Sequence, residues 1–198
     1  MMNSNNIGRF YNSIYWMYPI IDRFFLKQKK QVAHIINQLE HGTLLEIGIG
    51  SGSTLPFYTK HEIIGIDLSS KMLSIAKKKK TKVPVQLFIG DATQIMNGNA
   101  TIDYVIINHV LAATNNPEQI LKEAFRVLKP NGHLIILNHF TPKNLLGLID
   151  YCFIPFTKLL RFRSYFFLSD LKNLNLFKIE YKILSKPFGY YQIVVLKK

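Results

Sequence analysis

Short apolar runs alternate along this chain with segments whose apolar residues recur at helical spacing. The runs predict five strands, at 43–47, 62–66, 85–89, 102–107 and 133–137. Three intervening segments predict helices, over 27–39, after the capping residue Ser69 or Ser70, and after the capping residue Asn116. Strands and helices that alternate in this way are typical of βαβ units. We therefore expect an α/β fold built on a doubly wound, mostly parallel sheet.

The remaining segments indicate how this sheet is completed and covered. Two apolar runs near the carboxyl end, 177–184 and 190–196, predict an antiparallel hairpin on the sheet edge. We expect the irregular stretch 141–169 to be an insertion that covers the substrate. The aromatic-rich segment 1–26 is expected to form a lid or a membrane contact, with a helix simply packed on the sheet as the alternative. No internal repeat or low-complexity linker divides the chain, so we expect 1–198 to form one domain.

Composition and charge narrow the class of protein. Of the 198 residues, 48% are hydrophobic and 19% charged, which is typical of a folded chain. The net charge of +13 attracts nucleic acid, an anionic membrane or an acidic substrate, without choosing among them. A single cysteine, Cys152, excludes an internal disulfide and a cysteine-based zinc cluster, and no metal site is expected. No apolar run reaches the roughly 20 residues that span a bilayer, so we expect a protein that is soluble or lies on a membrane surface. The single cysteine fits a reducing cytoplasm.

A glycine-rich turn follows the first predicted strand. Gly48, Gly50 and Gly52 occupy alternate positions there, which suits a backbone that passes very close to a ligand. Taken alone, the run also fits a tight strand-to-helix turn or a dinucleotide fingerprint. Its spacing differs from that fingerprint, however, and a carboxylate, Glu46, precedes the first glycine. A carboxylate favours a cofactor that carries an ammonium and a sulfonium, as S-adenosylmethionine does.

Two aspartates follow the next two predicted strands. Asp67 ends the second strand, where an acidic side chain can accept hydrogen bonds from both ribose hydroxyls. Asp91 follows the third strand and can accept from an adenine amino group. Either aspartate alone would more commonly be a helix cap or a solvated loop residue. Because the carboxyl ends of parallel strands meet at one edge of the sheet, the ordered set predicts a single cofactor site.

Four sequence runs, at 45–52, 65–73, 90–92 and 126–132, resemble the class I S-adenosylmethionine-dependent methyltransferase family. In the last run Asn131 stands where the family has a glycine, a change that asparagine tolerates at positive φ. The resemblance implies a Rossmann-like fold and S-adenosylmethionine as cofactor. It implies these contacts: Gly48 and Gly50 at the methionine portion, Asp67 at the ribose, and Asp91 and Ala92 at the adenine. It extends the expected cofactor-binding set to Glu46, Gly52, Leu68, Met72 and Asn108.

A narrower resemblance concerns the acceptor of the methyl group. The runs 45–58, 134–140 and 187–189 are similar to the soluble-type bacterial phosphatidylethanolamine N-methyltransferases. Such enzymes methylate a lipid amine in up to three steps, ending at phosphatidylcholine. The amino-terminal Tyr-Asp pair of that subgroup is broken here, because Ile21 precedes Asp22. A methyltransferase that acts on a soluble small molecule or a quinone precursor is the alternative, since it would share every cofactor residue.

Three residues are candidates for the acceptor site. His139 follows the fifth strand, and we expect it to orient the amine or phosphate or to relay a proton, with His109 as the second candidate. Each histidine is equally compatible with a structural role. An amine with a pKa of about 10.4 is mostly protonated at neutral pH, but the sulfonium charge and desolvation both lower that pKa. The aromatic face of Tyr18 can stabilise the cationic product.

Aromatic and basic residues also indicate a membrane partner. The stretch 145–167 mixes many apolar residues with Lys158, Arg161 and Arg163, a combination that sinks into anionic lipid; an ordinary hydrophobic helix is the alternative. We expect a phospholipid substrate and a monomer bound peripherally to the inner face of the membrane. Nucleic acid is not an expected partner, because the chain after Asn108 lacks the Pro-Pro-aromatic turn that grips a flipped base.

Overall fold

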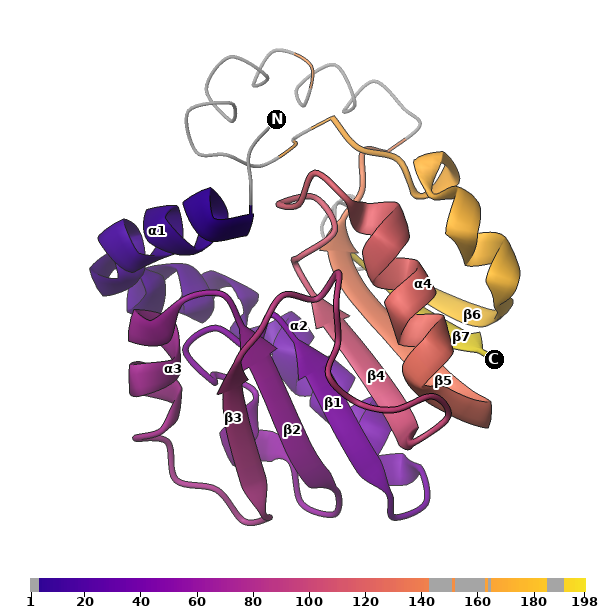
Figure 1. Ribbon diagram of the computed structural model, residues 1–198, viewed down its shortest axis with the longest axis horizontal. Helices are drawn as coiled ribbons and strands as arrows, with labels where there is room; N and C mark the ends of the chain where they lie inside the picture. The colour runs from indigo at the N-terminus through magenta and orange to yellow at the C-terminus, as the bar shows by residue number, and fades with distance from the viewer. Residues whose placement is uncertain (1–3, 143–150, 152–162, 164, 185–190) are drawn as a thin grey trace.

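The computed structural model describes residues 4–142, 151, 163, 165–184 and 191–198. They form a seven-stranded sheet in the order β3-β2-β1-β4-β5-β7-β6 (Figure 1). The strands are β1 (Thr43–Ile47), β2 (Glu62–Asp67), β3 (Val85–Ile89), β4 (Ile102–Asn108), β5 (Leu128–His139), β6 (Lys178–Leu184) and β7 (Tyr191–Lys197). The expected doubly wound α/β fold with an antiparallel edge at the carboxyl end is confirmed.

Strand order reverses at β1, which is the topological switch point of the sheet. β1 pairs in parallel with β2 on one side and with β4 on the other. β3 extends the sheet in parallel beyond β2, and β5 does so beyond β4. β7 then runs antiparallel to both β5 and β6. Open sheets of this kind bind ligands beyond the carboxyl ends of their parallel strands at the switch point.

Helices cover both faces of the sheet. They are α1 (Ser4–Ile14), α2 (Tyr18–Gln38), α3 (Ser70–Ala76) and α4 (Pro117–Val127), with short 3₁₀ segments η1 (Tyr15–Met17), η2 (Leu55–Phe57), η3 (Leu168–Asp170) and η4 (Lys172–Leu176). In Figure 1, α4 lies in front of the sheet and α2 behind it. Leu121 of α4 and Leu45 of β1 share one buried cluster. Ile36 of α2 and Leu44 share the cluster on the opposite face, because neighbouring strand residues point to opposite sides.

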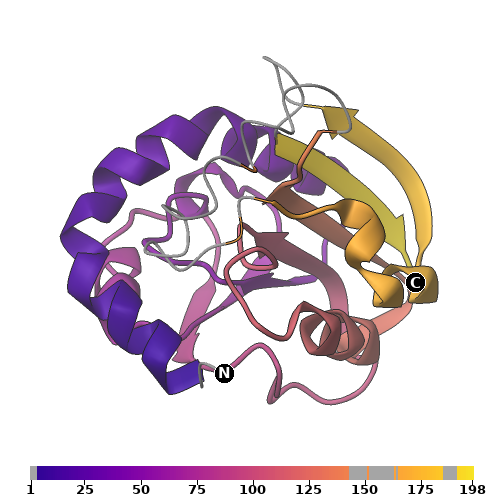
Figure 2. The same cartoon turned by 90° about the horizontal axis from the view of Figure 1, so that it is seen from above.

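The amino-terminal segment is more helical than the sequence pattern predicts. The predicted helix 27–39 is the second part of α2, which begins at Tyr18 with a proline in its first turn, where no N–H is needed. α1 precedes it and docks on the start of α3. There Asn12 Oδ1 accepts hydrogen bonds from Ser69 Oγ at 2.6 Å and from Lys71 N at 3.2 Å. Seen from above, α1 and α2 curve along one side of the molecule (Figure 2).

Two helices begin at the residues that the sequence predicts. Ser69 caps α3, and its Oγ accepts a hydrogen bond from Met72 N at 3.1 Å. Asn116 occupies the capping position of α4, but its side chain makes no capping hydrogen bond. The start of α4 therefore depends on the proline in its first turn and on burial of its apolar face rather than on the predicted cap.

The fifth strand is longer than predicted. The sequence places it at 133–137, whereas β5 already begins at Leu128. Leu128 pairs with Ile102 of β4 before the register shifts, so the first part of β5 is irregular. Asn131 adopts a φ of 64° there, a conformation that asparagine tolerates better than most residues.

Some sequence predictions fall outside the described residues. Most of the stretch 141–169, with its expected substrate cover and lipid contact, lies there, as does the run 187–189. Within the described part of the chain, no helix is long and apolar enough to cross a membrane. The organisation of 1–198 as one domain stays a prediction.

Leu121→Ala is expected to lower the free energy of unfolding by about 2–5 kcal/mol, because it leaves a cavity at a fully buried position between α4 and the sheet. The neighbouring Lys122 is exposed on the same helix. Lys122→Ala should therefore change the stability by less than about 0.5 kcal/mol. Urea denaturation of the three proteins tests this, and equal losses in the two variants would contradict the packing of α4 through this face.

Candidate functional site

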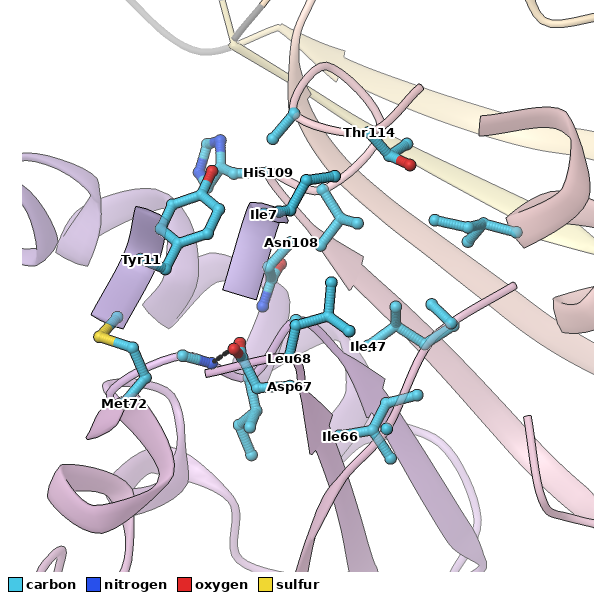
Figure 3. Close-up of a pocket in the computed structure, with 18 of the residues that line it drawn as sticks. Ile7, Tyr11, Ile47, Ile66, Asp67, Leu68, Met72, Asn108, His109 and Thr114 are labelled. Carbon is cyan, nitrogen blue, oxygen red and sulfur yellow. Dashed lines mark hydrogen bonds between the residues drawn. The ribbon is translucent and has the colours of Figure 1, made fainter. Parts of the chain in front are cut away.

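A pocket lies beyond the carboxyl ends of β1 to β4, at the switch point (Figure 3). The ends of these strands, the loops that follow them, and helices α1 and α2 supply its walls. The lining includes most of the residues that the sequence analysis selects: Tyr18, Gly48, Gly50, Asp67, Leu68, Met72, Asp91, Ala92, Asn108 and His109. Folding thus gathers residues that are distant in the sequence into one cavity.

The glycine-rich turn presents bare backbone to this pocket. Gly48 and Gly50 have φ angles of 69° and 56°, which residues with a side chain rarely adopt. A Cβ atom at Gly48 would lie 2.1 Å from Val110 Cγ2 of the neighbouring loop. The turn therefore forms a cradle that a side chain would fill. Gly52 has a different role, because a Cβ there would meet Leu55 and Ala76 in the core, and Gly52 does not line the pocket.

Asp67 is held rigidly at the end of β2. Its Oδ2 accepts a hydrogen bond from Gly50 N at 2.9 Å, and its Oδ1 accepts one from Ser69 N at 2.8 Å. Burial raises the pKa of this carboxyl group, while the backbone N–H groups oppose the rise. Each carboxylate oxygen can accept further hydrogen bonds. Asp67 can therefore receive two adjacent hydroxyl groups, as the sequence analysis expects for a ribose.

The turn after β3 carries Asp91 into the pocket wall. Asp91 Oδ1 accepts hydrogen bonds from both the backbone N and the Oγ1 of Thr93, each at 2.8 Å. This contact fixes the turn, and Ala92 is buried beside it. Asp91 thus combines a structural role with a place in the pocket lining. Its contact with adenine stays a prediction.

Glu46 differs from the expectation, because it does not line the pocket. Its carboxylate is buried and accepts hydrogen bonds from Thr54 Oγ1 at 2.8 Å, Tyr58 OH at 2.7 Å and Asn108 Nδ2 at 2.6 Å. Burial raises the pKa of Glu46, and these donors counteract the rise. Its position supports a structural role in which it orients Asn108, and a direct contact with a cofactor does not follow from it.

Asn108 is the last residue of β4, and only the nitrogen of its side-chain amide has a hydrogen-bond partner among the described residues. Its Nδ2 group donates to Glu46, which fixes the orientation of the amide. Its Oδ1 is buried without a hydrogen-bond partner among the described residues. A buried acceptor without a partner is costly, so its presence in a pocket indicates a ligand that donates a hydrogen bond.

His109 also presents a buried atom without a partner. It has a φ of 57°, its ring lies 4.4 Å from the ring of Phe25, and its Nε2 makes no hydrogen bond within the described part of the chain. Burial, assisted by the charge of Lys29, lowers its pKa to about 3. The imidazole is therefore neutral at physiological pH, and its Nε2 can exchange a hydrogen bond with a bound molecule.

The other two candidates for the acceptor site differ in position. Tyr18 lines the pocket, with its ring 5.8 Å from that of Tyr11. Burial raises its pKa well above the usual value, so the phenol stays neutral. His139 is not part of the pocket lining; its ring lies 5.8 Å from Tyr191, whose ring in turn lies 5.6 Å from His109. A contact between His139 and the substrate therefore stays a prediction, and the geometry favours His109.

The structure adds pocket residues that the sequence analysis does not select. Asp22 and Lys29 of α2 form an ion pair of 2.6 Å in the wall, and Tyr11 and Phe25 extend the aromatic lining. Asp22 and Lys29 are seven residues apart, which places them on the same face of a helix two turns apart. The spacing would have revealed the pair if the predicted helix had begun before residue 27.

Comparison with known sequences shows what the central part of the chain resembles. Residues 45–136 match the family model described as a methyltransferase domain. A phosphatidylethanolamine N-methyltransferase from Cereibacter sphaeroides is 31% identical over 118 residues, which cover 57% of each chain. A demethylmenaquinone methyltransferase from Lactobacillus johnsonii is 37% identical over 86 residues, which cover 41% of this chain and 35% of that protein. The chain thus spans about half the length of the first of these relatives and about a third of the second.

Solved structures share the fold over nearly the whole chain. An S-adenosylmethionine-dependent methyltransferase from Thermotoga maritima superposes with a TM-score of 0.72 at 20% identity, covering 95% of this chain and 99% of that one. Together with the methyltransferase-domain match over 45–136, this likeness supports a class I methyltransferase fold, for which S-adenosylmethionine is the expected cofactor. The cyclase SpnF matches with a TM-score of 0.77 at 15% identity, covering 100% of this chain and 97% of that one, so the fold alone does not determine the reaction.

The residues present fit S-adenosylmethionine. The glycine cradle admits a ligand against bare backbone, and the fixed Asp67 carboxylate suits the hydroxyls of a ribose. The unpartnered Asn108 Oδ1 suits an N–H donor, such as an ammonium group. The matched range 45–136 contains all of these residues.

His109→Asn is expected to make the fold less sensitive to acid. A histidine whose pKa falls to about 3 on folding contributes its full stability only above its unfolded pKa of about 6.5 and loses it as the pH falls. The wild type should therefore lose about 2 kcal/mol more than the variant between pH 7 and pH 5. Asparagine is chosen because it tolerates the positive φ.

Urea denaturation at both pH values measures this difference. The exposed histidine of α2, His34, supplies the control, since His34→Asn should follow the wild type. Identical acid sensitivity of wild type and His109→Asn would contradict a neutral, buried His109.

Proposed function

We propose that this chain transfers methyl groups from S-adenosylmethionine to the amine of phosphatidylethanolamine, and to its mono- and dimethyl forms, towards phosphatidylcholine. The observation that carries the lipid assignment is the two-faced helix α2. One face lines the pocket with Tyr18, Asp22, Phe25 and Lys29. The opposite face exposes large apolar side chains to solvent, so one helix joins the reaction site to an apolar surface.

The exposed face of α2 has the composition of a membrane-contact surface. Ile20 and Phe24 of α2 continue a row that begins with Trp16 of the preceding η1; the three residues are four apart and are 65%, 76% and 66% exposed, respectively. Arg23 and Lys27 are exposed on the same helix. Apolar side chains flanked by basic ones bind the interface of an anionic membrane, each basic residue adding about 1 kcal/mol. We infer peripheral binding to the inner face of the membrane from this surface.

The charge of the pocket is opposite to the charge of the chain. The lining contains three carboxylates, of Asp22, Asp67 and Asp91, and one ammonium, of Lys29, whereas the chain carries a net charge of +13. A net negative pocket favours the cationic cofactor and a cationic amine over anionic acceptors. The basic surface then serves the membrane, and the acidic pocket serves the reacting groups.

The bound cofactor supplies an electrophilic methyl group on a positively charged sulfur. Methyl transfer is an in-line displacement, so the main task of the residues is to position the amine. At pH 7 an amine with a pKa of about 10.4 needs roughly 4 kcal/mol to lose its proton. Because burial lowers the pKa of His109 to about 3, its imidazole is a weak base that holds a proton poorly. Its Nε2 can orient the amine through a hydrogen bond while desolvation lowers the pKa of the amine.

The aromatic side chains exclude water and face the cationic centre. Tyr11, Tyr18 and Phe25 line the same side of the pocket as His109. Burial raises the pKa of Tyr11 to about 12, so its ring stays uncharged. Aromatic faces stabilise methylated ammonium groups through cation–π interactions. This lining suits an acceptor whose positive charge persists through successive methylations.

A soluble small molecule or a quinone precursor is the second candidate acceptor. The demethylmenaquinone methyltransferases among the relatives support it. The neutral His109 and the aromatic wall do not distinguish between the two, whereas the acidic lining and the exposed apolar face of α2 favour the lipid amine. An assay with lipid decides between them.

Incubation with methyl-labelled S-adenosylmethionine and mixed anionic liposomes is expected to label phosphatidylethanolamine derivatives. Separation of the lipids shows whether one, two or three methyl groups are added. Asp67→Ala should lower the transfer at least 10-fold, because it removes the hydrogen-bonding carboxylate expected at the ribose. Binding of S-adenosylmethionine without any labelled lipid would contradict the phospholipid assignment and favour a soluble acceptor.

Trp16→Ala/Phe24→Ala is expected to weaken binding to anionic liposomes by at least about 100-fold, since the two large apolar side chains each contribute roughly 1.5–3 kcal/mol when buried in lipid. Flotation with liposomes measures this. Ile89→Ala/Met96→Ala is the matched control, because it removes two exposed apolar side chains (64% and 92%) outside α2. Equal flotation of the two double variants would contradict a membrane surface on α2.

A further inference from the structure

Asp22 and Lys29 place a buried ion pair in the pocket wall, and both side chains contribute to the charge of the pocket. Lys29 Nζ lies 2.6 Å from Asp22 Oδ1, and the two side chains are only 12% and 11% exposed. Both residues line the pocket. A buried pair is seldom more stabilising than packed apolar side chains, because both charges lose their hydration. Its position at a ligand cavity therefore points to a role in binding.

Hydrogen bonds attach this pair to the glycine-rich turn. Ser51 Oγ donates to Asp22 Oδ2. Lys29 Nζ donates to Ser53 Oγ at 2.8 Å, and Ser53 Oγ lies 3.2 Å from Asp22 Oδ1. Gly50 of the same turn donates its N–H to Asp67. The turn thus connects the carboxylate expected at the ribose with the Asp22–Lys29 pair.

The Asp22–Lys29 pair still has a hydrogen-bond donor and an acceptor position available for a ligand. Lys29 has three N–H donors, and the two bonds above use two of them. The Asp22 carboxylate offers about four acceptor positions, of which three have donors nearby. Opposite charges fixed side by side complement a ligand that carries one ammonium and one carboxylate on the same carbon. Such a ligand also adds no net charge to the buried pair.

We propose that Asp22 and Lys29 bind the amino-acid end of the cofactor, with Lys29 at its α-carboxylate and Asp22 at its α-ammonium. This inference rests on the proposed use of S-adenosylmethionine. Asn108 Oδ1, buried without a partner among the described residues, supplies a second acceptor for the ammonium. α2 therefore contributes to cofactor selectivity: it admits adenosyl compounds that retain a full amino-acid group and disfavours those that have lost it.

Calorimetric binding of four ligands tests the proposal without any turnover. S-adenosylmethionine and S-adenosylhomocysteine carry both charged groups, decarboxylated S-adenosylmethionine lacks only the carboxylate, and 5′-methylthioadenosine lacks both. Lys29→Met should weaken the binding of S-adenosylhomocysteine about 10- to 100-fold, because it removes one charge-assisted hydrogen bond. The affinity for 5′-methylthioadenosine should change by less than about 3-fold. The variant should also lose the preference for S-adenosylmethionine over its decarboxylated form.

Two further variants make the result specific. Asp22→Asn should weaken the binding of S-adenosylmethionine and of its decarboxylated form to the same extent, because both ligands retain the ammonium group. Lys30→Met is the matched control, since Lys30 is exposed next to Lys29 and lies over the ring of Phe57; it should bind all four ligands as the wild type does. Asp22→Asn/Lys29→Met removes both charges, which avoids leaving one buried charge unpaired and keeps the test valid if a single variant unfolds.

The outcomes separate this inference from the proposed function. A wild type that binds none of the four ligands would overturn the proposed function itself. A wild type that binds them, together with Lys29→Met and double variants that keep the full preference for the amino-acid group, would overturn only the role of the ion pair. The same holds if Lys29→Met raises the KM for lipid and leaves cofactor binding unchanged, since Lys29 would then face the acceptor.

Discussion

A buried carboxylate at the switch point of the sheet is the constraint on which the site depends. Glu46 accepts hydrogen bonds from Thr54 and Tyr58, which follow the glycine-rich turn, and from Asn108 at the end of β4. A buried charge without such donors would cost several kcal/mol, so the three donors have little freedom to move apart. The Glu46 side chain, which does not line the pocket, thereby holds the loop after β1 on one side and the side-chain amide of Asn108 on the other.

A second chain of hydrogen bonds joins the amino-terminal arm to the same place. Asn12 of α1 accepts from Ser69, Ser69 N donates to Asp67, and Asp67 also receives the N–H of Gly50. The position of α1 is therefore linked through two residues to the carboxylate expected at the ribose. α2 joins the turn from the other side, through Ser51. The arm is part of the binding site and not a cover laid over a finished one.

The sheet was predictable because its signals are local. The apolar runs, the cap at Ser69 and the glycine-rich turn each depend on a few neighbouring residues, and the mostly parallel sheet follows from the alternation of strands and helices. The hydrogen bonds of Glu46 and the position of His139 outside the pocket lining could not be predicted in this way. From the sequence alone, a carboxylate before a glycine-rich turn suggests a contact with a ligand. Only the structure shows that three hydrogen-bond donors surround Glu46. The pairing of Asp22 with Lys29 was missed because the predicted helix begins only at residue 27, whereas α2 begins at Tyr18.

The acceptor is the hardest property to derive, since the same fold supports both methyltransferases and the cyclase SpnF. The residues expected at the cofactor lie on the sheet and its loops, and they do not constrain the acceptor. The acceptor half depends on what is added to the sheet, and here that addition includes α2. A helix with an acidic and aromatic face in the pocket and an apolar face toward solvent has little reason to keep large exposed apolar side chains for a soluble substrate. Those side chains are consistent with an acceptor that is delivered from an interface, with its amine entering the pocket while its apolar part remains in the membrane.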